Sequence, residues 1–126
     1  MKDTILKFRF KDKALVINAP IILENEFKEF GFRSLPGLTE KSSNTLAFVN
    51  NSIELLSFLN TQLINIVPYN VFWIAYPKGT STIKTDINRD TIRETAQEYG
   101  LKTVTAVSID NTWSALRFRP VEKSGN

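Results

Sequence analysis

Residues 71–79 read VFWIAYPKG, and this stretch decides the fold. Six apolar residues from Val71 to Tyr76 follow one another without alternation, and Pro77 ends the run. A continuous run of this kind is typical of a strand that is buried on both faces, as in parallel sheets covered by helices. We therefore expect residues 71–76 to form the central strand of an α/β domain.

The residues after this strand predict a polar loop, a helix and a hairpin. Asn88 suits the N-cap of a helix, and Gly100 suits its C-terminal end. Residues 103–109 and 113–119 are expected to form two strands around an Asp-Asn pair, which tolerates the positive φ of a tight turn. The order strand, helix, strand, strand follows for residues 71–119.

Two further strand–helix units precede the central strand. Residues 15–17 and 46–49 are short apolar runs that predict buried strands. Apolar residues at helical spacing follow each run, first at Leu23, Phe27 and Phe30, then at Ile53, Leu56, Leu59, Leu63 and Ile66. Asn51 and Glu54 fit a capping box for the second of these helices, which is expected to end before Pro68.

The remaining segments are less regular. Residues 33–44 are rich in turn-forming residues and predict a loop. Residues 6–10 alternate between apolar and basic side chains, a pattern that fits a strand, although a short helix also accommodates it. No segment approaches 18 apolar residues, so we expect no membrane span. We expect one α/β domain over residues 1–120 and a flexible tail over residues 121–126.

Three crossover connections require a mainly parallel sheet with right-handed connections. We therefore expect a three-layer α/β fold with a mainly parallel, five-stranded sheet that ends in a C-terminal antiparallel hairpin strand. On this arrangement the strands at residues 15–17, 46–49 and 71–76 run side by side in one direction. Their C-terminal ends then meet at one end of the sheet.

Two resemblances support this expectation. The strand at residues 71–77, followed after a helix by a hairpin, resembles the C-terminal half of the class I methyltransferase fold, in which the final strand inserts antiparallel. Nearly the whole chain is similar to a small bacterial family of domains of unknown function, with a looser spacing from Ile21 to Thr45. The matching residues are Asn18-Ala19-Pro20, Tyr76-Pro77-Lys78, Lys84-Thr85-Asp86, Arg93, Val107-Ser108-Ile109-Asp110, Trp113-Ser114 and Leu116-Arg117-Phe118. The resemblance implies a truncated Rossmann-like, methyltransferase-like fold and implies no activity.

The methyltransferase resemblance does not extend to the cofactor. Those enzymes hold S-adenosylmethionine with a Gly-rich turn after the first strand. Here that position reads Asn18-Ala19-Pro20-Ile21-Ile22, without glycine. We therefore expect no cofactor.

The composition excludes several classes of enzyme. The 126 residues include no His and no Cys, and the net charge is only +3. Ser-His-Asp, Cys-His and zinc-hydrolase mechanisms need residues that the chain lacks. Without Cys, nothing in the chain needs an oxidising compartment, so a cytoplasmic location is expected. The basic residues are spread along the chain, so the charge does not indicate nucleic acid or a membrane as a partner.

Polar residues gather where the three parallel strands are expected to end. In α/β sheets, ligands bind beyond the carboxyl ends of the strands, where helix N-termini also point their N–H groups. The candidate ligand-binding residues at this end are Asn18, Asn50, Lys78, Thr80, Ser81, Lys84 and Asp86. Two Lys and several hydroxyls predict a site for a small anion, either phosphate or carboxylate. In the alternative interpretation, the same side chains only cap backbone groups in a solvated loop.

Trp113 and Arg117 are a second pair of candidates because they share one face of the last predicted strand with Arg119. An Arg stacked on an indole binds anions or bases in some proteins. Equally, Arg stems often cover buried aromatic rings without any ligand. Both interpretations remain open at this stage.

The sequence therefore predicts a non-catalytic binding or protein-interaction module whose partner is a small anion or a protein. The alternative is an enzyme of unknown reaction that uses Lys78 or Lys84 as an electrostatic clamp and Asp86 as a base. Weak nucleic-acid binding through Trp113 and Arg117 is a third hypothesis. We expect no metal site, because the spaced carboxylates have no further ligands.

Overall fold

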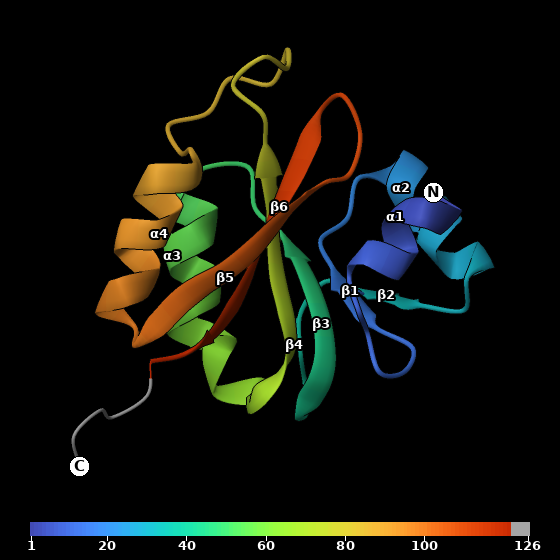
Figure 1. Ribbon diagram of the computed structural model, residues 1–126, viewed down its shortest axis with the longest axis horizontal. Helices are drawn as coiled ribbons and strands as arrows, with labels where there is room; N and C mark the ends of the chain where they lie inside the picture. The colour runs from blue at the N-terminus through green and yellow to red at the C-terminus, as the bar shows by residue number, and fades with distance from the viewer. Residues whose placement is uncertain (122–126) are drawn as a thin grey trace.

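The computed structural model describes residues 1–121 and shows an α/β fold built on one six-stranded mixed sheet (Figure 1). The strands are β1 (Leu15–Ile17), β2 (Arg33–Leu35), β3 (Ser42–Phe48), β4 (Ile66–Pro77), β5 (Leu101–Ser108) and β6 (Trp113–Pro120). The helices are α1 (Lys2–Lys7), α2 (Ile21–Glu29), α3 (Ser52–Thr61), the 3-10 turn η1 (Leu63–Asn65) and α4 (Arg89–Glu98). The strand order across the sheet is β2-β1-β3-β4-β6-β5.

The predicted fold class is wrong in its sheet. The strand pairs β1–β2, β1–β3 and β3–β4 are parallel, whereas β4–β6 and β5–β6 are antiparallel. The sheet is therefore a mixed one of six strands rather than a mainly parallel, truncated Rossmann-like or methyltransferase-like one of five. The additional strand is β2, which lies in the segment 33–44 that the turn-forming residues predict as a loop. It has only three residues and pairs with β1 alone, so its composition gives little sign of it.

The arrangement of the three central strands is confirmed. Val16 lies opposite Leu46 between β1 and β3, and Leu46 lies opposite Trp73 between β3 and β4, with all three strands parallel. These strands therefore finish at the same end of the sheet, which we call the carboxyl end. The opposite end, where they begin, is called the amino end.

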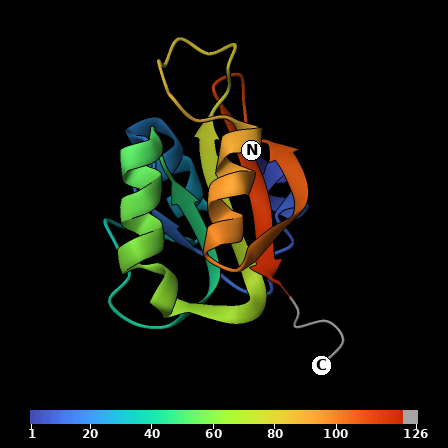
Figure 2. The same ribbon diagram turned by 90° about the vertical axis from the view of Figure 1, so that its left-hand side faces the viewer.

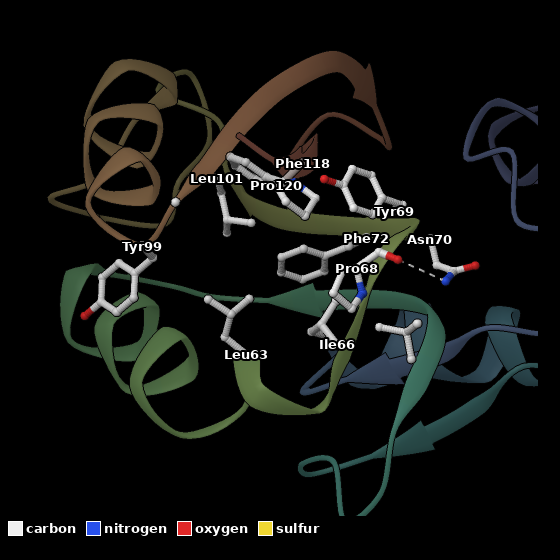
Figure 3. A pocket seen from close by; sticks show the side chains of 12 residues that line it. Leu63, Ile66, Pro68, Tyr69, Asn70, Phe72, Tyr99, Leu101, Phe118 and Pro120 are labelled. Atoms are coloured by element: carbon white, nitrogen blue, oxygen red, sulfur yellow. Dashed lines mark hydrogen bonds between the residues drawn. The ribbon is translucent and has the colours of Figure 1, made fainter. Parts of the chain in front are cut away.

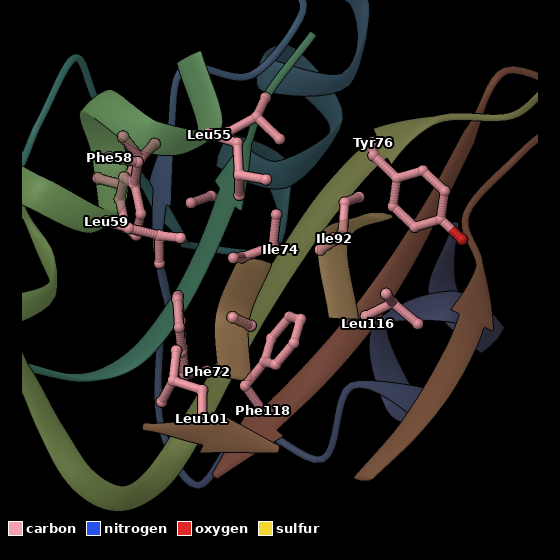
Figure 4. Close-up of a cluster of buried hydrophobic side chains, with 14 of the residues drawn as sticks. Leu55, Phe58, Leu59, Phe72, Ile74, Tyr76, Ile92, Leu101, Leu116 and Phe118 are labelled. Carbon is pink, nitrogen blue, oxygen red and sulfur yellow. The ribbon is translucent and has the colours of Figure 1, made fainter. Parts of the chain in front are cut away.

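The continuous apolar run of β4 is explained by burial on both faces. Phe72, Ile74 and Tyr76 belong to one hydrophobic cluster, and Val71 and Trp73 belong to a second. The first cluster packs under α3 and α4, which lie side by side on one face of the sheet (Figures 2 and 4). Side chains of α2 and the residues after α1 belong to the second cluster, on the other face.

Trp73 holds the N-terminal segment onto the second face. Its indole N–H donates to the carbonyl of Phe8 at 2.9 Å, and the two rings meet edge to face with centroids 5.2 Å apart. Both side chains are fully buried. The segment before Phe8 is α1, so the short helix, and not the alternating strand, is the correct choice there.

Two details of the middle segment differ from the prediction. The buried face of α3 carries Leu55, Phe58 and Leu59, while Ile53 is 78% exposed. The helix ends at Thr61, so the helical spacing does not continue to the later apolar residues. The helix does end before Pro68, as predicted, and Pro68 itself lies inside β4.

The C-terminal elements follow the prediction closely. Asn88 caps α4 through a hydrogen bond from the N–H of Thr91, whose hydroxyl accepts from the N–H of Asn88 in return. Gly100 has a φ of 77°, which glycine adopts without strain. The final strand, β6, runs antiparallel to both of its neighbours. The predicted flexible tail falls on residues 121–126, of which 122–126 lie outside the described residues.

Candidate functional site

The carboxyl end brings three loops into contact through polar side chains. Asn18 follows β1 and adopts a left-handed φ of 59°, a conformation that Asn tolerates better than most residues. Its amide donates to the carbonyl of Phe48 and to Oε1 of Glu54, both at 3.4 Å. The loop after β1 is thereby attached to β3 and α3, as the parallel strands predict.

Glu54 is the centre of this contact. Its Oε1 accepts from the backbone N–H of Asn50 at 2.9 Å and from the Asn50 side-chain amide at 3.0 Å, in addition to Asn18. Asn51 caps α3 by accepting from the N–H of Glu54 at 2.9 Å. The predicted capping box is therefore half formed, because Glu54 returns to Asn50 rather than to Asn51. Three amide donors fix the position of this carboxylate.

Asp86 fastens the loop before α4 to the first turn of α3. Its carboxylate accepts from the backbone N–H of Ser52 at 2.8 Å and from the Ser52 hydroxyl. The Ser52 hydroxyl and then its N–H lower the pKa of Asp86 below the ordinary value of 3.8, because both bonds favour the ionised form. Thr85 adds a bond from its hydroxyl to the Asn50 carbonyl at 2.6 Å. A helix N-terminus attracts anions, and at α3 the protein's own carboxylate takes that place.

The beginning of this loop, with Lys78 and Ser81, makes a different set of contacts. Lys78 donates through Nζ to the Ser108 hydroxyl at 2.6 Å and through its backbone N–H to the Thr112 carbonyl, so it joins β4 to the β5–β6 hairpin. Ser81 donates to the carbonyl of Lys78 at 2.8 Å. Thr80 and Lys84 are exposed. The structure thus brings Asn18, Asn50 and Asp86 together at the carboxyl end, and it places Lys78 and Ser81 in a different set of contacts.

Trp113 and Arg117 lie on the same face of β6, but they do not form one exposed surface. Trp113 is only 5% exposed and packs edge to face on Phe48, with ring centroids 5.1 Å apart. Arg117 lies opposite Trp73 in the middle of the sheet. Burial, followed by repulsion from Arg119, lowers the pKa of Arg117. The indole of Trp113 is therefore packed against the protein's own Phe48.

A groove of about 380 Å³ lies beside this network, between α3 and the end of β1. Its apolar floor comes from the sheet and from α3, and includes Ile17, Val49 and Phe58. One face of α3 supplies its polar wall, with Glu54, Ser57 and Thr61 on successive turns, and Gln62 follows at the C-cap of the helix. We call this space the carboxyl-end groove.

Of the polar residues that line the groove, the sequence marks only Asn18 as ligand-binding, and it misses Glu54, Ser57, Thr61 and Gln62. The spacing of Asn51 and Glu54 did mark Glu54, but as the partner of a helix cap. Ser57 carries no pattern of its own. Only the position of α3 against β1 shows that both residues face the same groove.

The described residues contain no group of three or more carboxylates that could hold a metal ion, and no helix among them is long and apolar enough to cross a membrane. No protein-family model and no curated protein matches the chain. The resemblance to a bacterial family of domains of unknown function therefore stays a prediction.

Proposed function

We propose that this chain is a non-catalytic binding module that holds a small polar ligand in the carboxyl-end groove. The observation that carries the proposal is the fixation of Glu54. Three amide donors bind its Oε1, and among the described residues no hydrogen bond to Oε2 is found. A carboxylate that is positioned in advance and lines a groove is suited to receive a donor from a ligand.

The charges around the groove favour a ligand with an ammonium group or several hydroxyls. None of the residues lining the groove is Lys or Arg, and Glu54 is the one charged residue among them. The Ser57 hydroxyl lies one helical turn further along the same wall. An anion at the carboxyl end would meet both Glu54 and Asp86, so the anion-binding form of the proposal ranks second. That form would use Lys84 and Thr80 on the exposed loop.

The contacts of Asp86 disfavour the alternative of an enzyme. A general base needs a pKa near the working pH and a free lone pair directed at the substrate. The lowered pKa of Asp86 and its two bonds to Ser52 fit a helix cap better than a base. Lys78 is likewise engaged with Ser108.

The proposal also covers the cellular location of the protein and its possible binding to another protein or to nucleic acid. A cytoplasmic location agrees with the absence of Cys from the sequence. A protein partner would meet the exposed side chain of Ile53, which lines the rim of the groove. Nucleic-acid binding through Trp113 would require its buried ring to become accessible.

Ligand-induced thermal stabilisation tests the proposal. The probes are butylamine and ethanolamine, with phosphate and acetate as the anionic set. We expect the amines to raise the melting temperature of the full chain and the anions to have little effect, because a ligand that binds only the folded state stabilises it. Glu54→Gln keeps an Oε1 acceptor for the amides but removes the charge, so the amine effect should disappear.

The matched control is Glu94→Gln, an exposed carboxylate on α4 outside the groove, which should leave the amine effect unchanged. Stronger stabilisation by phosphate than by amines would mean that the ligand is an anion rather than an ammonium compound. Turnover of a phosphoester or acyl substrate that Asp86→Asn abolishes would replace both forms of the proposal with the enzyme.

A further inference from the structure

A second cavity lies at the amino end of the sheet, far from the network described above (Figure 3). It originates in an irregularity of β4. Between the pairs Ser42–Ile66 and Asn44–Val71, β3 advances by two residues (44 − 42) while β4 advances by five (71 − 66). Residues 67–70 therefore leave the regular ladder, as in an extended β-bulge, and they line the cavity.

The backbone at this bulge is strained. Tyr69 has a φ of 64°, a left-handed conformation that is a genuine outlier for a bulky residue. Its side chain is nevertheless 59% exposed, so burial of the ring does not compensate for the strain. Strained residues of this kind concentrate at binding sites. Figure 3 shows Tyr69 and Tyr99 at opposite ends of the cavity, with Phe72 between them.

The cavity is mainly apolar, and two of its polar side chains, Tyr99 and Asn70, already have partners. The phenol of Tyr99 donates to Oδ1 of Asn60 at 2.6 Å, and the amide of Asn70 donates to the carbonyl of Pro68 at 3.3 Å. Aromatic rings from β4 and β6, with apolar side chains from η1 and β5, form the remaining surface. A ligand with many polar groups would lose its hydration here without replacement.

We propose that this cavity, the amino-end pocket, binds a free small molecule consisting of one aromatic ring with at most one polar substituent. Its volume is about 180 Å³. An apolar cavity of about 150 Å³ is sufficient to bind benzene, so the amino-end pocket holds a single ring with room for a short substituent. The neighbouring rings, Phe72 and Phe118, are able to contact a bound ring in offset or edge-to-face geometry.

Titration of the full chain with benzyl alcohol, followed by backbone amide resonances, tests this inference. We expect saturable shifts confined to the segments that line the pocket, residues 63–72, 99–101 and Phe118, and no such shifts with butylamine. Leu63→Phe places a ring inside the pocket and should weaken benzyl alcohol binding at least about tenfold. Ile64→Phe is the matched control, because Ile64 lies on the same 3-10 turn but is 76% exposed. It should bind like the wild type.

A second variant covers the case in which Leu63→Phe does not fold. Tyr69→Ala removes one wall of the pocket from an exposed position and should weaken binding several-fold. Unchanged affinity in either folded variant would overturn the inference, and so would shifts scattered over the molecule. Tighter binding of N-acetyl-phenylalanine amide than of benzyl alcohol would also overturn it, because the occupant would then be a side chain of a peptide. Each outcome is independent of the carboxyl-end groove, since Glu54→Gln should leave benzyl alcohol binding intact.

Discussion

The two ends of the sheet are built by different means. At the carboxyl end, polar side chains join three loops, as when Asp86 binds Ser52 and Thr85 binds Asn50. At the amino end, apolar side chains from β4, β5 and β6 meet around a cavity. The carboxyl end needs polar side chains because the helices that follow β3 and β4 begin there with unpaired N–H groups. A dense polar cluster in the sequence therefore marks the end where loops are fastened, and only some of its members remain available to a ligand.

The largest effect is expected at the amino end. Phe72 lines the amino-end pocket and is also part of the core under α3 and α4, stacked on Phe58 with ring centroids 5.9 Å apart. Phe72→Ala should lower the free energy of unfolding by about 3–5 kcal/mol, the usual cost of such a truncation. Chemical denaturation measures it. A loss smaller than that of Thr85→Val, a variant at the carboxyl end, would contradict the view that apolar packing dominates at the amino end and single polar contacts at the carboxyl end.

A smaller effect is expected from a single polar contact at the carboxyl end. Thr85→Val keeps the shape of the side chain but removes the hydrogen bond to the Asn50 carbonyl and the acceptor for the N–H of Ile87. We expect a loss of about 1 kcal/mol in the free energy of unfolding. Thr82→Val, at an exposed position in the same loop, is the control and should change little. Equal losses in both variants would mean that the loop is not fastened through Thr85.

At the strained residue Tyr69, a substitution by glycine should stabilise the protein relative to a substitution by alanine. Tyr69→Gly relieves the left-handed conformation, so the protein should be more stable than Tyr69→Ala by about 1 kcal/mol. The two variants lose the same ring, which makes alanine the appropriate reference. Thermal unfolding of the pair measures the difference. Equal stability would show that residue 69 does not hold its positive φ in solution.

The smallest effect is a change in the dependence of stability on pH. Because the folded-state pKa of Asp86 is lowered, its contribution is complete above the ordinary value of 3.8 and is lost as the pH falls through the folded pKa. The wild type should therefore lose stability more steeply than Asp86→Asn as the pH is lowered below about 5. Glu24, whose pKa is also lowered, titrates in both proteins and cancels in the comparison. Parallel acid titrations of the two proteins would refute the role of Asp86 as a cap.

The sequence predicts much of the fold because strong local patterns carry it. The unbroken run at residues 71–76 indicates a strand that is buried on both faces, and the cap at Asn88 marks the start of α4. The short strand β2 is not predicted, because three residues are too few to show the alternation that marks a strand. The position of Pro68 within β4 is not predicted either. A proline is tolerated there because residues 67–70 bulge out of the regular ladder.

The candidate site is predictable only in part. The sequence locates Asn18, Asn50 and Asp86 at one end of the sheet, because parallel strands bring their following loops together. It does not show that Asp86 binds Ser52, which depends on the path of a long loop. It also does not show that Glu54 faces a groove, since this requires the packing of α3 beside β1.

The most direct test of the central claim is a map of the amides that shift when butylamine is added to the full chain. We expect saturable shifts at Asn18, Asn50 and Ser57, around the carboxylate of Glu54, and their loss in Glu54→Gln. Shifts at Lys84 and Thr80 on addition of phosphate, with none at the groove on addition of the amine, would contradict it.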